Sequence, residues 1–377
     1  MYVNPRKIHY PVSVEIKPSR RPSKFYYFPD SKKKNLLEYA NALRVLSMLA
    51  VVFTHVSSPL VESIRDVHSV NWWVAIIYDS ASRWAVPIFV FISGSLLLDP
   101  AKDEPIKTFF KKRADRILVP LVFWSMFFSI INIYVYKWSL KLVLLKVFNG
   151  VPSVHLWYLY MMLGLYLITP MLRRYVRQAT ESERLYFIVV AFAIASPFTM
   201  YFYVHSREVN VAFLKFIPYT AYFVCGYHLS RVDPACVKLK YLLPILLSSI
   251  AVVALGTALL VRYTTGDYVW ELFHTHFSPF IIVMSITTFL LFIKLDSLKL
   301  PRLSPLYKFF SFMAPYTLGI YIVHIMIIVE IGKYTNIWAY TIHPIIGIPL
   351  TSLLTFTVSF LIVYPIGKIP YLKKIVI

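Results

Sequence analysis

The chain has 377 residues, of which 58% are hydrophobic and 15% charged, and its mean hydropathy is +0.63. This composition excludes an ordinary soluble domain. The formal charge is +21, but the basic residues lie at the ends of apolar segments and form no single patch, so the charge does not indicate nucleic-acid binding. Cys225 and Cys236 have no spacing typical of a disulfide framework or a zinc site, so neither redox nor metal chemistry is indicated.

Residues 1–38 are basic and contain prolines but no long apolar run, and we expect a flexible cytoplasmic tail there. Residues 39–377 carry apolar segments of about 20 residues, the length that a bilayer requires. Backbone groups in lipid must bond within their own segment, so these segments are expected to be helices. Ten are predicted, at Ala42–Leu60, Trp72–Leu98, Ile117–Tyr136, Val154–Leu172, Leu185–Val204, Val211–Ser230, Tyr241–Val261, Ser278–Leu295, Pro315–Ile331 and Ile345–Gly367.

The distribution of basic residues predicts the topology. Lys and Arg gather in the tail, in every second connection and at the C-terminus, whereas the other connections hold few. By the positive-inside rule, both termini then lie in the cytoplasm and the number of spans is even. The sequence therefore predicts an all-α integral protein of the cell membrane, a bundle of about ten transmembrane helices. Arg83 and Lys215 fall inside predicted spans.

The first predicted span carries two ionisable residues. Such a side chain costs at least ~2.5 kcal/mol at the centre of a membrane helix, so each one needs a reason to be there. His55 follows Arg44 by eleven residues, which at 100° per residue places both on one helical face, about 16 Å apart along the axis. His55 taken alone is compatible with a satisfied core histidine, and Arg44 with a residue that extends to the interface. Their shared face favours a functional pair.

The second span contains Arg83, then Pro87 and the pair Ser93–Gly94. These residues predict a kinked helix. Its polar groups either line a cavity or allow close helix packing, and both interpretations stay open.

A basic cluster, residues 111–116, precedes the third span. It is either a topology signal or a phosphate-binding site at the amino-terminal end of a helix, where the helix dipole helps. His155 and Trp157 open the fourth span from the outer side, and Tyr321 and His324 lie in the ninth. A lone histidine in a membrane helix is often a packing residue, so this interpretation of His324 stays open beside a functional one.

Taken together, these pieces resemble the membrane-bound acyltransferase-3 family, in its short, membrane-only branch. The resemblance covers nearly the whole apolar part of the chain. It rests on five motifs in order: Asn41-Ala42-Leu43-Arg44 with His55, Val86-Pro87-Ile88-Phe89 with Ser93-Gly94, Arg113-Ala114-Asp115-Arg116, His155-Leu156-Trp157-Tyr158-Leu159, and Gly319-Ile320-Tyr321-Ile322-Val323-His324. One departure is Asn41, where many relatives have Asp, so Arg44 lacks a carboxylate partner unless Glu38 serves.

The resemblance implies an enzyme, an O-acyltransferase that transfers groups other than aminoacyl groups. Acetyl-CoA or another acyl-CoA would be the donor substrate, with no permanently bound cofactor and no metal. The acceptor would be a hydroxyl of a glycan, a lipid-linked sugar or another polar molecule. The partners would then be membrane lipids, acyl-CoA and this acceptor, with no nucleic acid.

The resemblance also assigns roles to residues. His55 and Arg44 are implied to be catalytic, and Arg113 and Arg116 to bind the donor at the cytoplasmic face. His55 would act as a general base or as an acyl carrier. Other candidates for contacting the substrate or orienting these groups are Arg83, Ser93, His155, Trp157, Tyr321 and His324.

Two other classes of function remain possible from the sequence. Proline-broken spans with buried ionisable groups also occur in transporters and flippases, although no inverted repeat is visible here. A membrane sensor or scaffold without chemistry is the third hypothesis. Only the enzyme should consume acyl-CoA as it modifies an acceptor.

Overall fold

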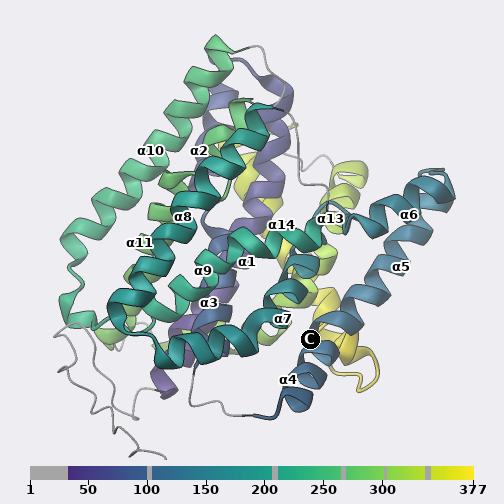
Figure 1. Ribbon diagram of the computed structural model, residues 1–377. Helices are drawn as coiled ribbons and strands as arrows, with labels where there is room; N and C mark the ends of the chain where they lie inside the picture. The colour runs from purple at the N-terminus through teal and green to yellow at the C-terminus, as the bar shows by residue number, and fades with distance from the viewer. Residues whose placement is uncertain (1–32, 100–103, 206–210, 265–268, 301–303, 336–340) are drawn as a thin grey trace, which may run out of the picture.

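The computed structural model describes residues 33–99, 104–205, 211–264, 269–300, 304–335 and 341–377, and Figure 1 shows their arrangement. All the regular structure in these residues is helical, as the sequence predicts. The predicted tail lies outside the described residues up to residue 32. Residues 33–38, which were assigned to that tail, instead begin helix α1 (Lys33–Ile64).

Eight helical stretches in the described residues are long and apolar enough to cross a membrane. They are residues 39–64 of α1, α2 with α3, α4 to α5, residues 181–202 of α8, α10, α11, α12 to α13, and α14. The bounds of these helices are Val70–Ser82 for α2, Ala85–Leu97 for α3, Ile106–Arg113 for α4, Val119–Tyr134 for α5, Glu181–Val204 for α8, Leu239–Tyr263 for α10, Pro279–Ser297 for α11, Ser304–Met313 for α12, Thr317–Tyr334 for α13 and Pro344–Ile366 for α14.

The other two predicted spans, Val154–Leu172 and Val211–Ser230, also form helices, but these helices differ from the eight stretches in length or polarity. Helix α7 (Trp157–Gln178) ends in a basic turn, and α9 (Phe216–Leu229) has only 14 residues, preceded by a short 3₁₀ turn. Neither is among the eight stretches. Helix α6 (Leu140–Phe148) was not predicted.

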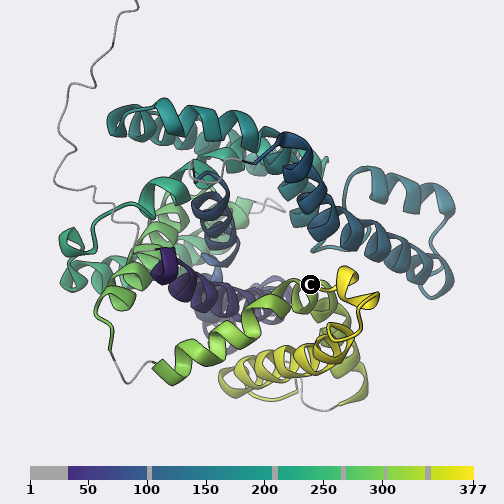
Figure 2. The same cartoon turned by 90° about the horizontal axis from the view of Figure 1, so that it is seen from below.

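Helix α1 is the central element of the bundle. It packs against α2, α3, α11, α12, α13 and α14. Seen from below, α1 lies between α7 and α8 on one side and α14 on the other, while α5 and α6 project outward (Figure 2). Polar residues on α1 can therefore meet side chains from several other helices.

The second span is broken, as the sequence predicts. Helix α2 ends at Ser82 and α3 begins at Ala85, so Arg83 and Trp84 form the junction. Pro87 has no backbone N–H, so the carbonyl group of Arg83 loses the helical partner four residues ahead. Arg83 is thus at a helix break and not inside an α-helix, and the same is true of Lys215, the last residue of the 3₁₀ turn that precedes α9.

At the pair Ser93–Gly94 the structure supports close helix packing, one of the two interpretations that the sequence left open. Gly94 of α3 and Gly226 of α9 are close-approach positions, since a Cβ on Gly94 would lie 1.8 Å from the backbone oxygen of Phe223. A Cβ on Gly226 would lie 2.2 Å from that of Phe91. These glycines let two helices meet backbone to backbone. Ser93 donates a hydrogen bond to the backbone oxygen of Phe89, 2.8 Å away.

The prediction that the basic cluster starts a helix was wrong. The helix begins at Ile106, and residues Ala114–Leu118 form a single π-helical turn that joins α4 to α5. Phe109 is buried while Lys111 and Lys112 are exposed, so residues before the cluster already have a helical face to bury. Arg113 and Arg116 therefore lie within a continuous helix, without the dipole of an amino-terminal end. Single π turns occur frequently at functional sites.

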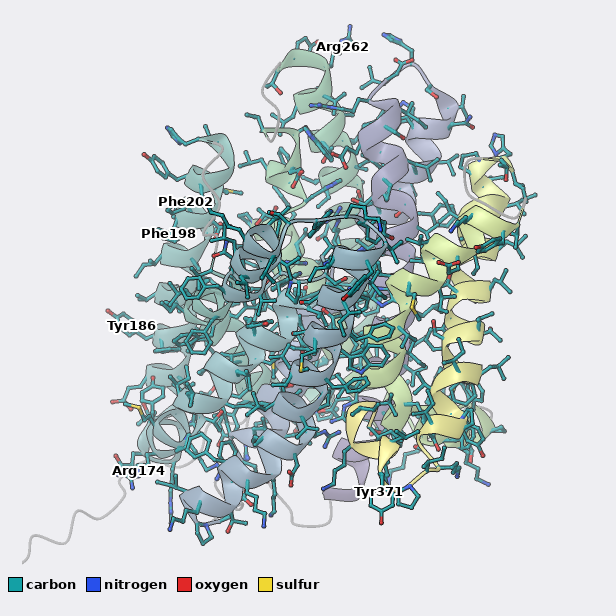
Figure 3. The ribbon with its side chains drawn as sticks, turned by 90° about the vertical axis from the view of Figure 1, so that its right-hand side faces the viewer. Arg174, Tyr186, Phe198, Phe202, Arg262 and Tyr371 are labelled. Atoms are coloured by element: carbon teal, nitrogen blue, oxygen red, sulfur yellow. The ribbon has the colours of Figure 1, made fainter. Side chains whose placement is uncertain are left out.

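Labelled residues distinguish the two ends of the bundle. Arg174 and Tyr371 lie at the lower end and Arg262 at the upper end (Figure 3), and α4 lies at the lower end in the same orientation (Figure 1). We use "lower end" and "upper end" in this sense below.

Candidate active site

Three histidines from separate parts of the chain meet inside the bundle. His55 comes from α1, His155 from the turn before α7 and His324 from α13. The ring centroid of His324 lies 5.2 Å from that of His55 and 5.1 Å from that of His155. His155 and His324 are buried, while His55 is half-buried. The sequence-predicted candidates His55, His155 and His324 thus form one cluster.

Hydrogen bonds to backbone oxygens fix two of these rings. Nε2 of His155 lies 2.9 Å from the backbone oxygen of Ile322, and a carbonyl can only accept, so Nε2 carries the proton. Nδ1 of His155 is then the acceptor for the hydroxyl of Ser153, 3.2 Å away. The hydroxyl of Tyr321 donates to the backbone oxygen of His155. His155 and Tyr321 thus hold the turn before α7 against α13.

His324 is fixed in the same way but keeps one nitrogen available. Its Nδ1 donates to the backbone oxygen of Tyr321 at 2.5 Å, which leaves Nε2 without a proton. Nε2 is buried and has no hydrogen-bond partner among the described residues. A buried acceptor without a partner costs free energy, so its presence beside His55 requires an explanation. The described residues hold no group of three ligands arranged for a metal ion.

A second polar cluster adjoins His55 at the break between α2 and α3. Arg83 pairs with the buried carboxylate of Asp79 at 2.6 Å, and its Nη2 donates to Ser58 at 3.2 Å. His274, from the turn before α11, lies 3.2 Å from Asp79 and 3.3 Å from Arg83. The positive charge of Arg83 interacts electrostatically with the imidazole of His55. Arg83 is a candidate from the sequence, whereas no sequence pattern singles out Asp79 or His274.

The arginines at the lower part of the site also gather. The guanidinium carbon of Arg113 lies 5.9 Å from the ring centroid of Tyr166 and 5.5 Å from that of Phe109. The charges of Arg113, Arg116 and Arg44 all act on Tyr166. The three predicted arginines are therefore neighbours, although Arg44 comes from α1 and the other two from the π turn and its flank.

Arg44 has a neutral partner. Its Nη1 donates to Oδ1 of Asn41 at 3.3 Å. Asn41 thus occupies the place of the carboxylate that many relatives carry, and it accepts a bond without neutralising the guanidinium charge. The side chain of Glu38, the other expected partner, lies outside the described residues.

Tyrosines connect the arginines to the histidines. The charge of Arg44 acts on Tyr158, and Ser93 lies next to the Tyr158 hydroxyl. The ring of Tyr158 lies 5.6 Å from that of Tyr321, and Tyr321 lies 5.7 Å from His324. A polar and aromatic path therefore runs through the bundle from the arginines at the lower part to the histidines.

A cavity of 1320 Å³ opens beside the histidine cluster. Its wall includes Arg83, which acts on His55, and Ser153, which is bonded to His155. Phe198 and Phe202 also line it, and Figure 3 shows both on the part of α8 towards the upper end. The cavity therefore belongs to the upper half of the bundle, whereas Arg113 is the last residue of α4, which lies at the lower end.

The predicted residue Trp157 lines this cavity together with two residues that the sequence analysis did not select. Lys215 Nζ lies 5.2 Å from the ring centroid of Trp157. The ring of His276 lies 6.0 Å from that of Trp157, and its Nδ1 is 2.7 Å from the hydroxyl of Tyr219. The sequence pointed to Lys215 only as a basic residue inside a predicted span, and it gave no pattern that singles out His276.

The fold and this site define a multi-pass membrane protein with an internal histidine cluster, a group of arginines and a large cavity. The family model of the acyltransferase-3 domain, described as an acyltransferase domain, matches residues 37–364. The chain belongs to this family, as its motifs predict, and it is a membrane-bound acyltransferase. Comparison with curated proteins and with solved structures gave no match.

Proposed function

We propose that this protein transfers an acyl group, acetyl in the first instance, from cytoplasmic acyl-CoA to a hydroxyl of a glycan or another polar acceptor. The donor enters from the lower end and the acceptor from the cavity in the upper half. The observation that carries this proposal is the path from Arg113 and Arg44 to His55, with the cavity in the upper half of the bundle. Two substrates that approach from opposite sides meet at His55 in this arrangement.

Arg113 and Arg116 have the chemistry that binding of the acyl-CoA donor requires. CoA carries phosphates, and guanidinium groups bind phosphate through charge-assisted, bidentate hydrogen bonds. Arg116 is exposed and Arg113 half-buried, so the pair reaches from the surface into the bundle. The pantetheine arm then extends past Arg44 along the tyrosines, and the thioester reaches His55. Arg44 lies about 16 Å below His55 along the helix axis, a span that an extended arm of this kind bridges.

His55 performs the chemistry by one of two routes. As general base, it accepts the proton of the acceptor hydroxyl while the oxygen attacks the thioester carbon. The carbon–sulfur bond then breaks, and the CoA thiolate leaves and takes up a proton. As acyl carrier, the imidazole nitrogen attacks the thioester first, releases CoA, and passes the acyl group to the acceptor in a second step.

Roles for the remaining candidates follow from their contacts. His155, Tyr321 and His324 pack around His55, whose ring lies 5.2 Å from that of His324, and Ser93 lies beside Tyr158 on the donor path. Arg83 and Trp157 face the acceptor in the cavity. Metal ions and permanently bound cofactors have no part in this scheme.

We further propose that α7 and α9 complete ten spans, with both termini in the cytoplasm of the cell. Helix α7 has 22 residues, enough for a bilayer, and Arg174 lies at the lower end of the bundle (Figure 3), with Arg173 and Arg177 in the same last turns, as expected of a cytoplasmic end. Helix α9 is buried among other helices and has no need to match lipid by itself. Labelling of single cysteines with an impermeant reagent tests this: position 141 should react from outside whole cells and position 177 only after lysis.

The test of the proposed function is release of CoA from acetyl-CoA by the purified protein in liposomes, with a crude glycan extract as acceptor. The His55→Gln variant should release none while keeping the size-exclusion profile and thermal stability of the wild type. Equal release from both proteins would remove His55 from the mechanism. A wild type that releases no CoA, yet moves labelled glycan across the liposome membrane, would replace the enzyme with a transporter.

The same assay separates the two routes. If His55 carries the acyl group, mixing enzyme and acetyl-CoA without acceptor gives a burst of about one CoA per protein. If His55 is only a general base, CoA appears only when acceptor is present.

A further inference from the structure

The cavity in the upper half has a group of residues that the transfer of an acyl group does not itself require. Lys215 and Arg83 are the two basic residues that the hydropathy pattern places inside spans, and both line this cavity from helix breaks. A cation in such a position is costly unless it has a partner or a ligand. Arg83 has Asp79 as its partner. Lys215 has no carboxylate partner among the described residues.

The aromatic ring of Trp157 holds Lys215 in place. Its Nζ lies 5.2 Å from the ring centroid, within the range of a cation–π interaction. Such an interaction positions the ammonium group but leaves its charge uncompensated. Lys215 is half-buried, so water screens this charge less than at an open surface.

His276 marks the point where the two cations act together. The charges of both Arg83 and Lys215 act on its imidazole, and no carboxylate does. Burial, with these two charges added, lowers the pKa of His276 to about 3, so the ring is neutral at physiological pH. Bonds from Tyr219 and Tyr222 to His276 keep it in place.

Two carboxylates also line the cavity. Glu330 comes from the last turns of α13, where its charge acts on Lys333, and Glu271 comes from the 3₁₀ turn Val269–Phe273. Arg83 and Lys215 are the charged residues that act on His276, and the start of α9, which follows Lys215, adds a positive contribution through the helix dipole.

The chemistry of this group suits an acidic sugar. Carboxylate and phosphate groups bind lysine and arginine, while the C–H faces of a sugar ring pack on an aromatic ring such as that of Trp157. Tyr219 is buried and lies 5.9 Å from Trp157, ring to ring, so it supports Trp157, whose half-buried ring provides the aromatic surface.

We infer that the group formed by Trp157, Lys215, Tyr219 and His276, with Arg83 beside it, is a subsite for a negatively charged group on the acceptor, a sugar carboxylate or a sugar phosphate. This inference rests on the proposed function for the role of the cavity and adds the class of acceptor. Binding there would place a neighbouring hydroxyl of the same sugar towards His55, because the charge of Arg83 acts on both His276 and His55.

The experiment compares two probes that differ in one group. We measure calorimetrically, without acyl-CoA, the binding of p-nitrophenyl β-D-glucuronide and p-nitrophenyl β-D-glucoside to the purified protein. The glucuronide should bind at least about tenfold more tightly, and added salt should reduce this difference. Glucose 6-phosphate against glucose extends the comparison, and whichever anion shows the larger preference identifies the group. Equal binding of the charged and neutral probes to the wild type overturns the inference.

Substitutions at Lys215 test whether this residue causes the tighter binding of the charged probe. Lys215→Met keeps an unbranched chain on Trp157 but removes the charge, so most of the preference should disappear, while Lys215→Arg should retain it. Lys141→Met is the control, because Lys141 is an exposed lysine of α6 outside the cavity lining. A preference that survives in a folded Lys215→Met protein places the anion elsewhere and overturns the inference.

Failure of this inference can be told apart from failure of the proposed function. A protein that releases CoA in a His55-dependent manner but shows no charge preference loses only the subsite. A protein that prefers the acidic probe but releases CoA equally well as His55→Gln loses only the proposed catalytic role.

Discussion

His324 donates from Nδ1 to the backbone oxygen of Tyr321 at 2.5 Å, and this bond leaves its Nε2 as a buried acceptor next to His55. The backbone of α13 thereby selects the tautomer of a side chain that contacts the proposed catalytic ring. In the proposed reaction, Nε2 of His324 is the acceptor that can orient a protonated His55.

The first prediction follows from that tautomer. Asparagine at position 324 can replace the Nδ1–H group but lacks any atom at the Nε2 position, whereas glutamine can place a polar atom there. We expect His324→Asn to lower kcat about 100-fold with little change in KM for acetyl-CoA, and His324→Gln to lower it less. Steady-state CoA release measures both. Similar kcat values for the two variants would show that Nε2 has no special role.

The second prediction concerns the donor site. Replacing Arg113 and Arg116 together with alanine removes both phosphate ligands and should raise KM for acetyl-CoA by at least about tenfold. The double variant Lys111→Ala and Lys112→Ala is the matched control, because it removes the same charge from neighbouring exposed positions. The bond from Lys112 to Glu104 lies at the surface, so its loss should matter little for stability.

Direct titration with CoA completes this comparison. A stable Arg113/Arg116 variant that binds CoA as tightly as the wild type would contradict the phosphate-binding role.

The third prediction is a pH dependence of stability. The pKa of His276 is about 3 in the folded protein and about 6.5 in the unfolded chain. The unfolded chain therefore binds a proton below pH 6.5 that the folded protein does not bind, so the contribution of His276 to stability is lost as the pH falls from 6.5 towards 3. Between pH 7 and pH 5 this loss amounts to about 2 kcal/mol.

Thermal unfolding in detergent at a series of pH values measures the effect. The Tm of His276→Gln should fall less than that of the wild type between pH 7 and pH 5, since glutamine does not titrate. Parallel curves for the two proteins would show that His276 is not responsible.

The fourth prediction concerns the contact between α3 and α9. Alanine at Gly94 or Gly226 would bring a methyl group against backbone oxygen, which cannot move without separating the helices. We expect either variant to lose stability by at least about 1–3 kcal/mol and to give little folded protein. Gly256→Ala is the comparison, because the new methyl group there meets only ring atoms of Phe273, and a ring can rotate away. A smaller loss of folded protein is expected for it, measured as the monodisperse fraction after purification.

The sequence predicts the helical class and most helix positions because lipid imposes a simple requirement on segment length and polarity. The short and amphipathic helices depart from that requirement. Helix α9 can be short because neighbouring helices cover it, and α4 and α6 bury only one side. Hydropathy alone therefore cannot establish how many of these helices cross the bilayer.

The candidate site could be predicted where spacing on one helix carries the signal, as for Arg44 and His55. The motif residues His155 and His324 were named, but their meeting with His55 depends on how α7 and α13 pack against α1. Asp79, His274 and His276 had no local pattern, since their partners lie on distant segments. Contacts across a bundle leave no periodicity in the sequence.

The π turn at Ala114–Leu118 has a consequence for the evolution of this region. A π turn contains one residue more than an α turn, so loss of a single residue there would restore a regular helix. The helix preceding the turn would then rotate by about 100° about its axis relative to α5. Arg113 would move away from Tyr166, and the distance between the two arginines in sequence would shrink from three residues to two if the loss fell between them. Insertions and deletions should therefore be tolerated far less at these five positions than in the connections on either side.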